Sequence, residues 1–125
     1  MGPEAKLYQK LKKNFTGFSL LRLENLSLLG TPDLLVYNNN SHFFTIELKV
    51  TKSKKVRFSP HQIAFHLRHP DNTFIIIEAL GPWSSNTYFM YRGSRIRELV
   101  TSGLKLDACS EGLEACRLML SELGA

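Results

Sequence analysis

The most constraining feature of the sequence is an almost unbroken apolar run, Phe74–Leu80, in which Glu78 is the single charged side chain. A short apolar run without polar alternation is typical of a strand that is buried on both faces of a sheet. Such a strand requires further layers that cover both faces. We therefore predict an α/β fold in which this segment belongs to a mixed central β-sheet flanked by helices.

The other elements follow from the spacing of apolar residues and from turn residues. Helices are predicted at residues 3–14, 60–69, 94–101 and 110–123, and further strands at 18–24, 33–37, 43–50 and 87–91. The segment Asn38–Ser41 has turn chemistry, so the strands on either side of it are predicted to form an antiparallel hairpin. Ser59-Pro60-His61-Gln62 is a capping-box sequence that starts the next helix.

The chain is predicted to form one domain. Its 125 residues, 43% hydrophobic and 22% charged, match an ordinary globular protein, with a core at about 3–92 and C-terminal helices at about 94–123. No apolar run approaches the ~20 residues of a membrane span, and the first residues lack the layout of a signal peptide. Cys109 and Cys116 are expected to be buried thiols, too far apart along a helix for a disulfide. We therefore expect a cytoplasmic protein.

The charge is distributed unevenly along the chain. Sixteen Lys and Arg residues and 11 Asp and Glu residues give a net charge of +5. Residues 1–70 hold eleven of the basic and four of the acidic residues, so this part carries +7 and the rest −2. The distribution favours an anionic partner for the N-terminal part. The basic loop, defined as Lys52, Lys54, Lys55 and Arg57, is the candidate for contacts with DNA phosphates, although lysine-rich loops are often only solvated surface.

Two of the four acidic residues in the basic part fall on the predicted hairpin. Asp33 opens its first strand, and Glu47 lies on the polar face of its second strand together with Lys49. Carboxylates a few ångströms apart repel each other and therefore favour a cation between them, and oxygen ligands favour Mg²⁺ or Mn²⁺. An ammonium on the same face can orient a water or neutralise charge on a phosphate. The structural alternative is a turn residue at Asp33 and a solvated edge strand at Glu47 and Lys49.

Pro32-Asp33 followed by Glu47-Leu48-Lys49 resembles the PD-(D/E)xK signature of the restriction-endonuclease-like nuclease superfamily. Within it, the chain looks most like the small Holliday-junction-resolvase-like and VRR-type nucleases, which include phage members. In those proteins a basic loop and a helix that opens with Ser-Pro-x-Gln follow the motif, and Ser59–Gln62 matches that pattern here. The resemblance covers about residues 3–80 and implies a restriction-endonuclease-like core.

The resemblance also implies roles for individual residues. Asp33 and Glu47 would be the principal ligands of Mg²⁺ or Mn²⁺, together with the backbone carbonyl of Leu48. Lys49 would be the catalytic lysine. Glu4 would be an accessory acid that touches the metal directly or through water, although its place in a first helical turn is explained equally well by the helix dipole.

Gln62 would orient the motif or contact a phosphate, although the capping box already accounts for it. Two aromatic residues near the hairpin between the later strands, Trp83 and Tyr88, are interpreted as packing residues rather than as surfaces for base stacking.

Together these features predict a metal-dependent DNA endonuclease that hydrolyses phosphodiester bonds, with a structure-specific, Holliday-junction-resolvase-like preference for branched or duplex DNA. A bacterial or phage-infected cell would be its setting. Cleavage of two strands requires two active sites, so a homodimer is expected. Its interface is predicted at Phe74–Leu80 or at four apolar residues of the last helix, Leu113, Cys116, Leu120 and Leu123. The alternatives are a nicking, flap or homing endonuclease, a catalytically inactive nucleic-acid-binding module, and a structural protein with a basic surface.

Overall fold

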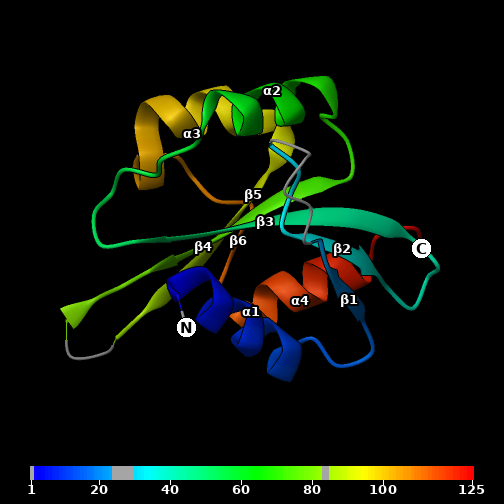
Figure 1. The fold of residues 1–125 in the computed structure, drawn as a ribbon. Coiled ribbons are helices and arrows are strands. Elements are labelled where there is room, and N and C mark those ends of the chain that lie inside the picture. The colour runs from blue at the N-terminus through cyan, green and yellow to red at the C-terminus, as the bar shows by residue number, and fades with distance from the viewer. Residues whose placement is uncertain (1, 24–29, 83–84) are drawn as a thin grey trace.

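The computed structural model describes residues 2–23, 30–82 and 85–125. Within these residues, one six-stranded sheet has helices on both faces (Figure 1). The strands are β1 (Ser19–Arg22), β2 (Leu34–Tyr37), β3 (Phe43–Thr51), β4 (Thr73–Ala79), β5 (Thr87–Arg92) and β6 (Ser110–Glu111). The α-helices are α1 (Pro3–Asn14), α2 (Pro60–Arg68), α3 (Ile96–Ser102) and α4 (Leu113–Ser121), and the short 3-10 helices are η2 (Gly93–Arg95) and η3 (Gly103–Lys105).

The strands lie in the sheet in their order along the chain, β1-β2-β3-β4-β5-β6. All neighbours are antiparallel except β3 and β4, which run parallel and are therefore joined by a crossover that contains α2. The α/β class with a mixed central sheet flanked by helices is confirmed. The order from α1 to β4 is also the order that the nuclease resemblance implies.

The apolar strand β4 is central, as its sequence predicts. It pairs with β3 on one side and with β5 on the other, and Phe74, Ile75, Ile76 and Ile77 are at most 3% exposed. Alternate side chains enter two separate cores: Ile76 packs beneath α1 and α4, and Ile75 packs beneath α3. Each fully buried side chain of this size contributes roughly 1.5–3 kcal/mol. This packing positions β3, the strand next to β4, in the interior of the sheet.

The helices of the N-terminal part begin where their sequence signals predict. α1 has Pro3 in its first turn and buries Leu7 and Leu11 against the sheet. At the start of α2, the Ser59 hydroxyl accepts a hydrogen bond from the Gln62 backbone N–H at 3.1 Å, and the Gln62 side-chain oxygen accepts one from the Ser59 N–H at 2.9 Å. The capping box is therefore confirmed.

The C-terminal part differs from the prediction of two plain helices. The segment 110–112 is not helical, because Ser110 and Glu111 pair with β5, and Gly112 then turns the chain at a positive φ of 87° before α4 begins. Cys109 precedes this strand, and its thiol donates to the Met90 carbonyl at 3.2 Å. Cys109 is exposed, so the prediction of two buried thiols is right for Cys116 and wrong for Cys109.

Both surfaces that the sequence offered as dimer interfaces are used within the chain. β4 lies between two other strands, so the run Phe74–Leu80 presents no free strand edge. On α4, Cys116 and Leu120 are fully buried in the core beneath α1, with Leu113 and Leu123 packed against it. The interface prediction is therefore wrong at both places.

Among the described residues, the structure has no helix long and apolar enough to span a membrane. Residue 24, the last of the first predicted strand, and Trp83 lie outside the described residues.

Candidate active site

The hairpin of β2 and β3 brings Asp33 and Glu47 together. Leu34 pairs with Ile46, so Asp33, one residue before β2, lies opposite Glu47 on β3. The Leu48 backbone N–H donates to Asp33 Oδ2 at 2.8 Å, which fixes this carboxylate against β3. The predicted neighbourhood of the two acids is confirmed.

Glu47 is a buried carboxylate with an unsatisfied oxygen. Only 2% of it is exposed, because β3 is an interior strand; the solvated edge strand considered above is therefore wrong. Its Oε2 accepts a hydrogen bond from Gln62 Nε2 at 3.2 Å, whereas its Oε1 has no hydrogen-bond partner among the described residues. Burial, followed by the Asp33 carboxylate, raises the pKa of Glu47 to about 9, with a smaller upward contribution from Glu4 and a downward one from Lys49.

Gln62 connects the acid and the lysine of the motif. Its Nε2 donates to Glu47, and its Oε1 accepts from Lys49 Nζ at 2.9 Å. The same Oε1 accepts from the Ser59 N–H of the capping box. Gln62 therefore caps the helix and at the same time connects Glu47 with Lys49.

Lys49 is held on two sides. Its ammonium donates to Gln62 and lies 4.9 Å from the centre of the Phe58 ring, a cation–π contact. Because β3 alternates its side chains, Lys49 projects from the same face as Glu47. A positive charge is thus fixed beside the buried acid.

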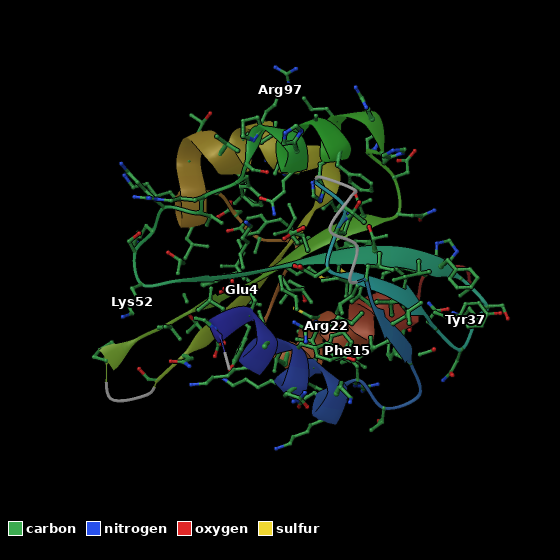
Figure 2. The ribbon with its side chains drawn as sticks, in the orientation of Figure 1. Glu4, Phe15, Arg22, Tyr37, Lys52 and Arg97 are labelled. Carbon is green, nitrogen blue, oxygen red and sulfur yellow. The ribbon has the colours of Figure 1, made fainter. Side chains whose placement is uncertain are left out.

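Glu4 enters the neighbourhood from the first turn of α1. It lines one hollow with Lys49 and with the chain from Val50 to Arg57, and Figure 2 shows it at the start of α1 below β3. No three His, Cys, Asp or Glu side chains of the described residues are grouped closely enough to hold a metal ion. Asp33 and Glu47 are therefore a pair of acids, and Glu4 lies near them without completing a cluster of three.

The placement of α1 depends on a buried acid that the sequence analysis did not use. Glu78 on β4 is 2% exposed and forms an ion pair with Lys10 of α1. Its Oε2 also accepts from Asn86 Nδ2 at 2.8 Å and from the Tyr88 hydroxyl at 3.1 Å. The available signal was an acid within an otherwise apolar strand, since a buried charge needs partners from other elements. Through this network, β4 holds the helix that carries Glu4.

The basic loop begins where β3 leaves the sheet, and its four charged side chains are exposed. The Thr51 hydroxyl donates to the Lys55 carbonyl at 2.8 Å and accepts from the Ser53 N–H at 3.2 Å. These bonds give the loop a defined shape. Lys52, Lys55 and Arg57 line the same hollow as Glu4 and Lys49, so three of the four loop residues lie near the lysine of the motif.

The donors present fit a hard divalent cation. The Glu47 carboxyl is almost fully buried beside the Asp33 carboxylate, which opposes its ionisation, and its Oε1 has no hydrogen bond among the described residues. Burying an uncompensated carboxylate costs several kcal/mol, whereas Mg²⁺ prefers such oxygen ligands. Asp33 and Glu47 are the residues that would hold the ion.

Comparison with known proteins adds little to this geometry. The sequence matches no family model and no curated protein. Among solved structures, the chain is similar to a Holliday junction resolvase from the archaeal hyperthermophile Archaeoglobus fulgidus, with 22% identity, coverage of 69% of this chain and 71% of that one, and a TM-score of 0.46. At this level the likeness carries no functional conclusion, and it does not extend to VRR-type or phage nucleases.

Proposed function

We propose that the protein is a metal-dependent DNA endonuclease that hydrolyses phosphodiester bonds. The observation that carries the proposal is the arrangement on β3: a buried Glu47 with a free oxygen, opposite Asp33, with Lys49 fixed two residues away by Gln62. An acid pair for a divalent cation and a lysine beside it are the groups that phosphodiester hydrolysis requires. The motif resemblance supports the same chemistry.

In this proposal Asp33, Glu47 and the Leu48 carbonyl hold Mg²⁺ or Mn²⁺, and Glu4 assists through a water molecule. The ion, when bound, lowers the pKa of a bound water and stabilises negative charge on the phosphate oxygens. Lys49 orients the attacking water and opposes the charge that develops in the transition state. Gln62 is a positioning residue, because it keeps both the Glu47 carboxylate and the Lys49 ammonium in place.

The substrate we propose is branched or duplex DNA, as for a Holliday junction resolvase, with the basic loop on the phosphates. Cutting both strands requires two copies, so the homodimer remains part of the proposal, with an interface other than the two tested against the fold. The alternatives use the same site: nicking, flap or homing cleavage differs in substrate geometry, and an inactive binding module would keep only the basic surface.

The proposal is tested by cleavage of labelled duplex, flap and four-way-junction DNA with Mg²⁺ or Mn²⁺. Wild type is expected to cut at least the junction, and Asp33→Asn and Lys49→Met to lose cutting while still binding DNA. Glu114→Gln is the matched control, since this exposed acid on α4 pairs only with Arg117. If wild type binds DNA but leaves every substrate intact with both metals, the enzyme reading is wrong and the binding-module alternative holds.

A further inference from the structure

A large groove lies near the candidate active site, between the basic loop and the C-terminal part of the chain. Its volume is about 1080 Å³. One wall is the segment Lys54–Phe58, and the other is the end of α3 with η3 and the residues up to Asp107. Figure 1 shows the chain between β3 and α2 passing close to α3. The C-terminal part, to which the sequence gave no role, thus forms half of a groove.

The groove carries a net positive charge, and most of that charge lies on the wall formed by the basic loop. Lys54, Lys55 and Arg57 lie on the loop side and Lys105 on the other, against a single acid, Asp107. The groove is open, and its volume exceeds the upper end of the usual range for small-molecule pockets, about 1,000 Å³. Its charge and openness favour an extended polyanion over a compact ligand.

The groove shares part of its lining with the hollow that contains Lys49. Lys55, Val56 and Arg57 line both cavities, and the second cavity also contains Glu4 and Lys49. A chain of phosphates that passes Lys49 therefore next meets the basic loop, whose residues Lys55 and Arg57 also line the groove with Lys105. This shared wall connects the groove with the substrate of the proposed reaction.

The two walls are fastened to each other by the backbone. The Leu104 N–H donates to the Lys54 carbonyl at 2.7 Å. Gly103 makes this approach possible, since its φ is +58° and a Cβ there would lie 2.1 Å from the Lys54 oxygen. The groove is therefore formed before any ligand binds, which lowers the entropy cost of binding.

We propose that this groove binds the sugar-phosphate backbone of the nucleic-acid substrate on one side of the scissile phosphate, with Lys105 as a phosphate contact. The inference rests on the proposed function, because that function identifies the polyanion as DNA. It gives η3 and the end of α3 a part in substrate binding, and it makes the length of one substrate arm a determinant of affinity.

The test measures DNA binding by fluorescence anisotropy in EDTA, so that cleavage plays no part. Lys105→Gln is compared with Arg97→Gln, which removes the same charge from the outer side of α3, where Arg97 points away from the sheet (Figure 2). Lys105→Gln is expected to weaken binding several-fold and to reduce the slope of log K against log salt by about one unit. Arg97→Gln is expected to leave the slope unchanged.

A second series shortens one arm of the DNA in steps from the cleavage site. The difference between wild type and Lys105→Gln should vanish once the arm is too short to reach the groove. Equal effects of the two substitutions, or a difference that persists on every arm length, would overturn the groove assignment while cleavage by wild type still supports the nuclease. If Lys105→Gln weakens binding as expected but wild type cleaves no substrate, the groove assignment stands and the nuclease proposal is refuted.

Discussion

Replacing Glu47 with Gln should stabilise the protein in the absence of metal while abolishing its activity. A Gln side chain keeps the size of Glu47, can accept the hydrogen bond from Gln62, and can donate to Asp33 without first taking up a proton. It also removes a buried group whose ionisation the fold opposes. We therefore expect the metal-free protein to be less stable because its site is arranged to bind a cation.

The magnitude follows from the pKa of Glu47, which rises from the ordinary 4.5 to about 9 in the folded chain. Between these pH values the folded chain keeps a proton that the unfolded chain has lost. The free energy of unfolding therefore falls as the pH rises, by about 1.4 kcal/mol per pH unit. At pH 7.5, three units above 4.5, the wild type has lost about 4 kcal/mol that the Gln variant retains. This is a large share of a typical total of about 5–15 kcal/mol.

The assay is urea unfolding in EDTA at pH 6, 7 and 8, for wild type, Glu47→Gln and the control Glu114→Gln. The difference between wild type and Glu47→Gln isolates this carboxyl, because other titrating groups such as the buried His66 remain in both proteins. We expect the Gln variant to be more stable at each pH, by an amount that grows with pH. Saturating Mg²⁺ should then stabilise wild type by RT ln(1 + [L]/Kd) and have no such effect on the variant. If the difference in unfolding free energy between wild type and Glu47→Gln does not change with pH, the reasoning is refuted.

Four further substitutions separate the roles of neighbouring residues. Lys49→Met should reduce the cleavage rate by roughly 10²–10³-fold with little change in DNA affinity, because it removes a charge used in the transition state; single-turnover kinetics and anisotropy measure the two quantities. Gln62→Leu should reduce cleavage, whereas Ser59→Ala, which removes the hydroxyl half of the cap, should cost about 1 kcal/mol of stability and leave the cleavage rate near that of wild type. Equal losses of cleavage in these two variants would contradict a positioning role for Gln62. Lys10→Met leaves the buried Glu78 without its cation and should cost about 3 kcal/mol in urea unfolding, and an unchanged midpoint would contradict the importance of that pair.

Elements with strong local signals could be predicted from the sequence. The start of α1 at Pro3, the capping box at Ser59 and the central position of β4 all depend on residues within the element itself. The neighbourhood of Asp33 and Glu47 was predictable as well, since a short hairpin fixes which residues face each other.

The features that the sequence did not reveal depend on distant parts of the chain. β6 is two residues long and forms because β5 offers an edge with which it can pair. The residues of β6 carry no strand signal of their own, so the apolar spacing of 110–123 resembled a single helix. The burial of Glu47 depends on β4 and α2 covering β3, and the bond from Gln62 depends on where the crossover places that helix. The partners of Glu78 come from α1, from β5 and from Asn86 just before β5, and no local pattern connects these segments with Glu78.

The single parallel pair, β3 with β4, has a consequence for the order in which the site comes apart. The hairpin that carries Asp33 and Glu47 closes over a short turn, whereas Gln62 belongs to the crossover that a parallel pair requires. α2 is a nine-residue helix in which only His66 is fully buried. We therefore expect α2 to open locally at a lower cost than the interior strand β3. Amide hydrogens of α2 should exchange before those of β3, and each opening would release the Glu47 carboxylate and the Lys49 ammonium from Gln62 while the acid pair stays assembled.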